Sequence, residues 1–247
     1  MRALLPALIT GLWASTAISG GLGEMTDAER TAFRNEVRAY LVENPDVIVE
    51  AMNVLQSRED MATGERDKAL LVSNADAIFK DPASWVGGNP DGDITIVEFM
   101  DYRCGYCRKA QPEIEELVTS DGNIRLIVKE FPILGEGSLL SARYAVAVLQ
   151  LYGDDAYKAT HDALMTMRGD ATPETLSRMA ADMGHDPAKI TERMAGPEVK
   201  AVIDANHALG SAMDINGTPM FVFQGSMVRG YVPLEDMRKL VADERKG

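Results

Sequence analysis

The sequence predicts an α/β fold in which helices are inserted between the two halves of a small β-sheet. Residues 94–99 are rich in β-branched side chains and predict a strand, and a segment with helical spacing from Cys104 to Val118 follows them. Residues 124–131 predict a second strand, and Ala- and Met-rich helices then occupy about residues 138–210. The rest of the chain predicts a hairpin and a final helix, at residues 220–223, 227–229 and from Leu234 onward.

The chain is acidic, with 247 residues and a formal net charge of −13 at pH 7. Nucleic acids are bound through clusters of Lys and Arg that neutralise phosphates, so this composition argues against a nucleic acid partner. The negative charge favours solubility instead. The length suits one enlarged domain with an additional element.

Residues 1–23 have the pattern of a secretory signal peptide. Arg2 precedes a mostly apolar stretch from Ala3 to Trp13, and small residues follow, so we expect cleavage between Ala17 and Gly23. The apolar stretch is shorter than the roughly 20 helical residues that span a bilayer. We therefore predict export to the periplasm, with an uncleaved anchor as the alternative.

Residues 24–82 predict a helical extension before the main domain. Thr26 and Glu29 have the spacing of a capping box, and the apolar residues after them recur at helical intervals. The Asn44–Pro45 step interrupts this pattern, and a second apolar stripe follows over residues 47–55. We expect these helices to precede the main domain without being needed to build it.

The apolar stripes of residues 26–72 need a covering surface. An amphipathic helix outside the core buries its stripe either on its own domain or on a second copy of the chain. Residues 26–72 are therefore a candidate homo-oligomerisation element, and the sequence does not separate the two arrangements. Residues 87–92 form a turn cluster that marks entry to the main domain, which we place at residues 83–247.

Cys104 and Cys107 are the only cysteines in the chain, and they stand at the start of a predicted helix. Secreted proteins that use cysteine for structure scatter several pairs, and a structural zinc site needs four ligands. A C-x-x-C motif between a strand and a helix therefore predicts a redox dithiol that exchanges disulfides. This chemistry needs neither a cofactor nor a metal.

Other uses of the cysteine pair remain open. The side chains could be buried small hydrophobic groups, or half of a zinc site completed by His161, His185 or His207. These histidines are distant in sequence and lack ligand spacing. Two thiolates could also bind copper(I), and a copper-binding or chaperone-like module is the alternative function.

The two cysteines have different expected roles. The first turn of a helix directs free backbone N–H groups at the sulfur of Cys104 and stabilises its thiolate, so Cys104 is the expected nucleophile. Cys107, one turn further along, is the expected resolving thiol that breaks the mixed disulfide.

Glu98 is the single charged residue in the predicted strand 94–99. An acid there could be buried beneath the dithiol and relay a proton to or from Cys107. The alternative is a carboxylate that points outward at the strand end. If Glu98 is buried, we expect a cation on the next strand, such as Arg125 or Lys129, to hold it there.

Thr218 and Pro219 directly precede the strand predicted at residues 220–223. Proline lacks the N–H that a sheet ladder needs, so Pro219 predicts a turn at that position. An X-Pro bond is far more often trans than cis, and the position of the proline alone does not choose between them.

Two motifs carry a resemblance to a known family. Residues 98–107 read Glu-Phe-Met-Asp-Tyr-Arg-Cys-Gly-Tyr-Cys, and residues 216–221 read Asn-Gly-Thr-Pro-Met-Phe. Together they resemble the DsbA family of thioredoxin-fold thiol–disulfide oxidoreductases, over residues 26–245 of this chain. The N-terminal helices are most similar to those of its suppressor-of-copper-sensitivity C (ScsC) branch.

The resemblance implies a thioredoxin fold with a helical insertion at about residues 138–210. It also implies that the bond before Pro219 is cis, that Thr218 tunes the thiolate, and that Glu98 is the buried acid. The expected partners are exported protein substrates that bear thiols or disulfides, and a membrane redox partner that resets the dithiol.

These motifs do not fix the direction of exchange. Gly105 and Tyr106 between the cysteines, and Thr218 before the proline, resemble the disulfide isomerases, whereas the fold resembles the oxidase. An oligomer formed through residues 26–72 would place several dithiols around one cleft, which suits isomerase or reductase work. A monomer would suit an oxidase or a reduced partner in copper tolerance.

Overall fold

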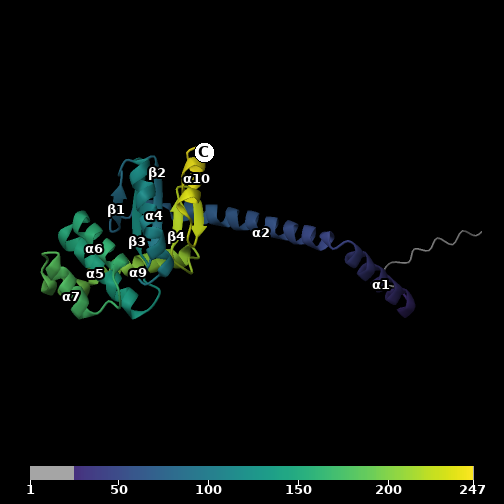
Figure 1. Ribbon diagram of the computed structural model, residues 1–247, viewed down its shortest axis with the longest axis horizontal. Helices are drawn as coiled ribbons and strands as arrows, with labels where there is room; N and C mark the ends of the chain where they lie inside the picture. The colour runs from purple at the N-terminus through teal and green to yellow at the C-terminus, as the bar shows by residue number, and fades with distance from the viewer. Residues whose placement is uncertain (1–24, 247) are drawn as a thin grey trace, which may run out of the picture. The chain divides into compact units, whose positions relative to one another are not determined.

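The computed structural model describes residues 25–246, which fall into two compact units (Figure 1). The first unit ends at Asp60 and the second begins at Met61. The predicted signal peptide, residues 1–23, lies outside the described residues. No helix within residues 25–246 is both long enough and apolar enough to cross a membrane.

The first unit contains helix α1 (Asp27–Glu43) and the start of helix α2 (Asp46–Ser73). The predicted capping box is present. The Thr26 backbone N–H donates to Glu29 Oε2 at 2.8 Å, and the Glu29 N–H donates to Thr26 Oγ1 at 3.3 Å. The predicted break at Asn44–Pro45 separates the two helices, so both predictions are confirmed.

The second unit is built around a five-stranded sheet with strand order β1-β3-β2-β4-β5. Strands β2 and β3 are parallel, and the other neighbouring pairs are antiparallel. Helices α5 to α9 separate β3 from β4 along the chain and form the predicted insertion. The strands are Trp85–Gly88 (β1), Ile94–Met100 (β2), Ile124–Glu130 (β3), Met220–Phe223 (β4) and Ser226–Arg229 (β5).

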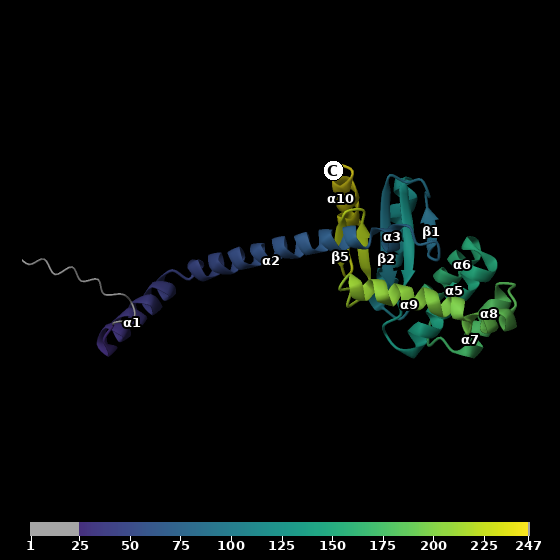
Figure 2. The ribbon, with the colours of Figure 1, turned by 180° about the vertical axis from the view of Figure 1, so that it is seen from behind.

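Helices cover both faces of this sheet (Figures 1 and 2). Because side chains alternate along a strand, Ile96 and Met100 of β2 point to one face, and Val97 and Phe99 point to the other. The first face packs against α4 and α10, and the second packs against α3 and the end of α9. The helices are α3 (Ala75–Phe79), α4 (Gly105–Asp121), α5 (Glu136–Tyr152), α6 (Asp154–Thr166), α7 (Pro173–Asp182), α8 (Pro187–Met194), α9 (Pro197–Ala212) and α10 (Leu234–Glu244).

The prediction of a turn cluster at residues 87–92 is partly wrong, because Gly87 and Gly88 belong to strand β1. A Cβ atom at Gly87 would lie 2.1 Å from the ring of Trp85, so the indole folded over the strand requires glycine there. Glycine is disfavoured in strands, so residue propensities do not predict a strand at β1, which contains two glycines.

The end of α2 and helix α3 belong to the core of the second unit. Leu71 and Ile78 are buried with Val97 and Phe99 on the second face of the sheet. The compact unit thus begins before residue 83, where the sequence places the domain limit. An amphipathic pattern shows that a helix is covered, but it does not show by which surface.

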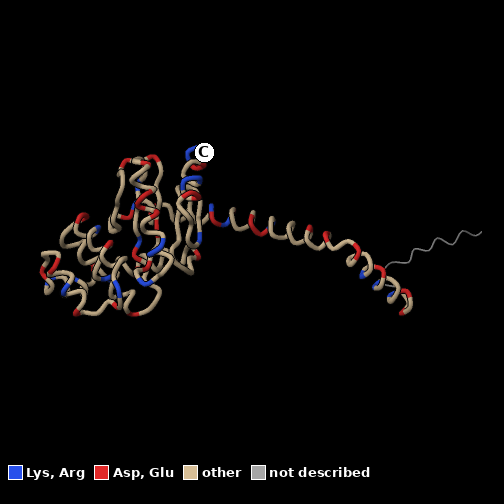
Figure 3. Tube along the Cα trace, viewed as in Figure 1, with Lys and Arg blue, Asp and Glu red and all other residues tan. Residues whose placement is uncertain are grey.

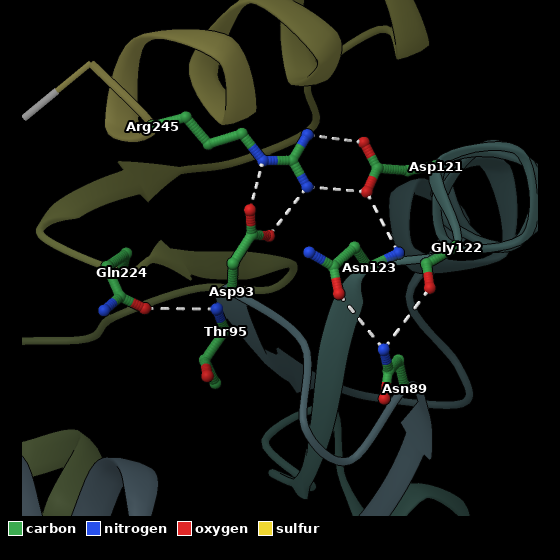
Figure 4. Close-up of polar contacts among 8 residues, drawn as sticks. All are labelled: Asn89, Asp93, Thr95, Asp121, Gly122, Asn123, Gln224 and Arg245. Atoms are coloured by element: carbon green, nitrogen blue, oxygen red, sulfur yellow. Dashed lines mark hydrogen bonds and ion pairs between the residues drawn. The ribbon is translucent and has the colours of Figure 1, made fainter.

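One arginine clamps the end of the sheet that is remote from the cysteines (Figure 4). The Arg245 guanidinium, just after α10, donates to Asp93 before β2 and to Asp121 at the end of α4, at 2.7 to 2.9 Å. These bonds lower the pKa of Asp121 below its ordinary range. Other positive and negative charges are interspersed along the second unit (Figure 3). Exposed ion pairs within a single helix, such as Arg238–Glu235 and Lys239–Asp236 of α10, add little to stability.

Gly210 of α9 packs directly on the ring of Phe131, and a Cβ atom there would lie 2.4 Å from that ring. We predict that Gly210→Ala lowers the free energy of unfolding by about 1–3 kcal/mol, because the overlap outweighs the gain in helix propensity. Urea unfolding measures this change. Gly64→Ala in α2 is the matched control, since its Cβ meets no atom within 4 Å and the change should be neutral or stabilising. Equal stability of the Gly210→Ala variant and the wild type would contradict the close packing.

Candidate functional site

The two cysteines lie at the start of α4, in the turn beyond the end of β2. Cys104 is the N-cap residue of α4, and its side chain makes no capping hydrogen bond. The first turn contains no acidic residue, so no carboxylate competes for the free N–H groups at the positive end of the helix dipole. The Cys104 thiol donates to the carbonyl oxygen of Thr218, with 3.1 Å between sulfur and oxygen.

Cys107 lies one turn further along α4 and is fully buried, whereas Cys104 is 7 % exposed. Both cysteines are free thiols. Burial raises the pKa of the Cys107 thiol, and the nearby carboxylate of Glu98 raises it further. The two sulfurs therefore lie in unlike surroundings, one at a helix end and the other in the apolar interior.

The turn before β4 faces Cys104 from the other half of the sheet. The peptide bond between Thr218 and Pro219 is cis. Thr218 is half-buried, and Pro219 is buried with its carbonyl accepting the N–H of Gly230 at 2.9 Å. The fold thus brings Thr218 to Cys104 across 114 positions of sequence.

Glu98 is buried in β2, on the sheet face that packs against α4. Its partners in the ladder are Val128 of β3 and Phe221 of β4. Neither of its carboxylate oxygens has a hydrogen-bond partner among the described residues. Burial raises the pKa of Glu98 to about 8, and the charge of Glu130 contributes to the rise.

The expectation that Arg125 or Lys129 holds Glu98 in place is wrong. Val128 is the register partner of Glu98. Arg125 and Lys129 lie an odd number of positions from Val128, so their side chains point to the opposite face of the sheet. There the Lys129 ammonium donates to Asp81 at 2.6 Å, and Arg125 donates to the last carbonyl of α3. The alternation of the strand directs both cations away from the dithiol.

The charged neighbour of Glu98 is a second acid, Glu130 at the end of β3. Glu130 Oε1 accepts hydrogen bonds from the hydroxyls of Tyr102 at 2.7 Å and Tyr157 at 2.6 Å, while Oε2 is buried without a partner. Burial raises the pKa of Glu130 above its ordinary value, although the hydrogen bonds from the two hydroxyls act in the opposite direction. The Tyr102 hydroxyl also lies 3.2 Å from His161 Nδ1.

Sequence reasoning missed Glu130 and its tyrosine partners. The available signal was weaker than for Glu98: a carboxylate near the end of a predicted strand that also contains two cations. Three charged residues in the segment 124–131, Arg125, Lys129 and Glu130, give that strand the pattern of an exposed one. The tyrosines give no periodic signal, because Tyr102 lies in a loop and Tyr157 on a remote helix.

Asp101 shapes the loop that carries the cysteines. Its Oδ1 accepts the N–H of Arg103 at 2.8 Å, and its Oδ2 accepts the N–H groups of Ile133 at 2.8 Å and Leu134 at 3.0 Å. Its backbone carbonyl accepts the N–H of Cys104 at 3.0 Å. A single buried side chain therefore joins the dithiol loop to the loop after β3.

Exposed apolar side chains adjoin this loop. Tyr106, between the cysteines, is 63 % exposed and stacks on Tyr231 with 6.2 Å between ring centroids. The Lys109 ammonium lies over the Tyr231 ring at 3.9 Å. Ile133 and Leu134 are also exposed, so an apolar surface lies beside the dithiol.

The histidines of the zinc alternative have other contacts. His161 Nε2 lies 3.0 Å from Gln111 Oε1, His207 Nε2 contacts a backbone carbonyl, and His185 stacks on Tyr152. Across residues 25–246, no group of three or more His, Cys, Asp or Glu side chains is arranged to hold a metal ion.

Family models match two parts of the chain. A model of the DSBA-like thioredoxin domain matches residues 95–242, which is more than half of the sequence. This chain belongs to the DSBA-like thioredoxin domain family. A model described as the copper resistance protein ScsC N-terminal domain matches residues 29–61. The predicted DsbA family, the similarity to its ScsC branch and the thioredoxin fold with N-terminal helices are confirmed.

Two solved structures show the same likeness. A thioredoxin-like oxidoreductase from Silicibacter pomeroyi is 43 % identical, with a TM-score of 0.66, over 70 % of this chain and 98 % of that one. The thiol-disulfide exchange protein alpha-DsbA2 from Wolbachia pipientis is 27 % identical, with a TM-score of 0.68, over 74 % of this chain and 97 % of that one. The predicted enzyme class, an oxidoreductase, is confirmed at the level of the family.

Curated relatives include much longer proteins. The chain is 26 % identical over 163 residues to the Na(+)/H(+) antiporter NhaA 1 of Salinispora arenicola, and this match covers 66 % of the chain and 25 % of the antiporter. The chain thus spans about a quarter of the length of the first curated relatives that it matches.

Glu98 makes stability depend on pH. Its pKa is about 8 in the folded protein and near 4.5 when unfolded, so between these values only the folded state holds the proton. Stability should therefore fall as pH rises from 5 to 8, and we predict a smaller fall in Glu98→Gln, by the order of a few kcal/mol. Urea unfolding at both pH values measures this. Glu116→Gln on the exposed face of α4 is the control, and an equal fall in all three proteins would refute the prediction.

Proposed function

We propose that this chain is an exported, periplasmic thiol–disulfide oxidoreductase that acts on protein substrates through Cys104 and Cys107. One observation carries the proposal: one sulfur stands at the N-terminus of a 17-residue helix, and the other lies one turn inside it. The family of the chain supports the same chemistry. Export rests on the predicted signal peptide at residues 1–23.

The exchange has two steps. The Cys104 thiolate, stabilised by the free N–H groups of α4, attacks one sulfur of a substrate disulfide and releases the other as a thiolate. Cys107 then loses its proton, and its sulfur forms a bond with Cys104 as the bond between Cys104 and the substrate breaks. The substrate gains two electrons and the dithiol loses two. The same steps in reverse donate a disulfide.

Three further residues assist these steps. Glu98 exchanges a proton with Cys107, since it is buried beside that thiol and its charge acts on it. Thr218 tunes Cys104 through the carbonyl that accepts the thiol hydrogen bond. Pro219 shapes the wall opposite Cys104, against which an extended substrate segment lies.

The partners follow from the surface and the chemistry. Exposed Tyr106, Ile133 and Leu134 beside the dithiol suit apolar segments of incompletely folded proteins. Each turnover changes the oxidation state of the dithiol, so a membrane redox partner must reset it.

The first unit supports self-association and thereby isomerase or reductase work. Helix α1 buries none of its residues, and Phe33, Val37 and Tyr40 are between 41 % and 54 % exposed. Apolar residues of this unit line an open hollow of about 540 Å³. A second copy of the chain would cover them, and several dithiols around one cleft could reshuffle wrong disulfides.

Replacing Cys107 tests the exchange. We predict that Cys107→Ser accumulates mixed disulfides between Cys104 and substrate proteins, because the resolving thiol is missing. Non-reducing electrophoresis and peptide mass mapping detect these adducts.

The double variant Cys104→Ser/Cys107→Ser is the control and should trap nothing. The alternative, a copper(I) module, predicts that Cys107→Ser loses tight copper(I) binding in a chelator competition and traps no partner. That outcome would replace the proposed function.

A change in α1 tests self-association and the direction of exchange together. We predict that Val37→Asp/Leu41→Asp converts an oligomer into a monomer in light scattering, because a charge on the apolar stripe cannot be buried. The monomer should lose reactivation of a scrambled-disulfide substrate and keep reduction of a simple disulfide. Ala39→Asp on the opposite side of α1 is the matched control, and a monomeric wild type would contradict the prediction.

A further inference from the structure

Strands β2 and β3 each carry one glutamate on the sheet face below α4. In their parallel register Glu98 pairs with Val128, and Met100 pairs with Glu130, so the two acids lie diagonally on neighbouring strands. Glu98 is 1 % exposed and Glu130 is 3 % exposed. Three of their four carboxylate oxygens have no hydrogen-bond partner in the described part of the chain.

Of the two acids, Glu130 alone accepts side-chain hydrogen bonds from the described residues. The hydroxyls of Tyr102 and Tyr157 both donate to its Oε1. Hydrogen bonds to a carboxylate favour its charged form, so the interior accommodates a negative charge better on Glu130 than on Glu98. Two close buried carboxylates resist ionising together, because their charges repel at low dielectric. The pair therefore retains one proton near neutral pH.

We propose that Glu130, held by Tyr102 and Tyr157, keeps the shared proton of this acid pair on Glu98, beneath Cys107. The inference rests on the proposed thiol–disulfide exchange and deepens it. Glu130 is a positioning residue, since it acts on the sulfur only through Glu98.

The proton on Glu98 serves the opening of the Cys104–Cys107 disulfide. An incoming thiolate attacks Cys104 and forms a new sulfur–sulfur bond, while the bond to Cys107 breaks and its electron pair leaves on the Cys107 sulfur. Glu98 donates its proton to that sulfur, which prevents a buried thiolate beside a buried acid. In the reverse step the Cys107 thiol gives its proton to ionised Glu98, so that step accelerates as Glu98 ionises.

Among residues 25–246, no cationic side chain forms a hydrogen bond with either carboxylate of the pair. The groups that face it come from α4, from the loop after β2 and from α6, and they are Cys104, Cys107, Asp101, Tyr102, Tyr157 and His161. Burial raises the pKa of both tyrosines and lowers the pKa of His161 to about 4, so the three rings are uncharged at pH 7. Lys129 points to the other face of the sheet.

The test follows Glu98 itself in the full chain. Carboxyl-labelled glutamate gives the titration of Glu98 by NMR, with assignment from Glu98→Gln. We expect Glu130→Gln to lower the pH midpoint of Glu98 by about one pH unit or more, because the neighbouring charge is removed. The pH midpoint of the resolving step, measured as release of glutathione from a mixed disulfide on Cys104, should move downward with it.

Two further variants calibrate this shift. Tyr157→Phe keeps both acids and removes one donor, so Glu130 competes better for the proton and the Glu98 midpoint should fall by a smaller amount. Glu136→Gln removes an exposed charge in the first turn of α5 and should leave both midpoints unchanged.

An unchanged Glu98 midpoint in folded Glu130→Gln would overturn the inference. A uniform loss of rate at every pH would also overturn it, since that pattern belongs to a purely structural role. If Glu130→Gln does not fold, the shift in Tyr157→Phe decides the matter alone. If Glu98 titrates as expected while Cys107→Ser traps no substrate, the proposed exchange fails and the proton arrangement stands.

Discussion

The buried carboxylate of Asp101 is the constraint on which the dithiol geometry depends. It accepts N–H groups from Arg103, Ile133 and Leu134, and its own carbonyl holds the N–H of Cys104. A carboxylate with three backbone donors tolerates burial without a cation. The end of β2, the start of α4 and the loop after β3 are thereby fixed together. The Cys104 sulfur stands at the N-terminus of α4 because this loop fixes where the helix begins.

Asp101, Glu98 and Glu130 are neighbouring buried acids. Their hydrogen bonds decide how well each one carries a negative charge. Among the residues that the structure describes, the Asp101 carboxylate accepts three backbone N–H groups, Glu130 accepts two hydroxyls, and Glu98 accepts no hydrogen bond. The three acids therefore differ in how well their surroundings accommodate a negative charge, and Glu98, which faces Cys107, is accommodated least. In the proposed exchange, redox change at the sulfurs is coupled to proton transfer, because the interior beneath them does not stabilise another charge.

The sheet keeps these acids apart from the cations that could neutralise them. Lys129 and Glu130 are adjacent in sequence, but the alternation of β3 sends the first to Asp81 behind the sheet and the second to the tyrosines in front. Because side chains alternate along the strand, the Lys129–Asp81 ion pair lies on one face of the sheet, and the acids of the proposed proton transfer lie on the other. The long insertion between β3 and β4 contributes Tyr157 and so completes the front side.

The sequence by itself determined the elements with strong local signals: the strand–cysteine–helix unit, the capping box at Thr26, and the strands before and after the insertion. Their periodicity and end signals are local, so no tertiary information was needed. Strand β1 was missed because Gly87 fits under Trp85, a contact that no propensity scale contains. Only the tertiary structure decided what surrounds Glu98. The partner of a buried acid depends on strand register and on helices far away in the chain, and these fix Glu130 and its tyrosines, rather than a lysine, as its neighbours.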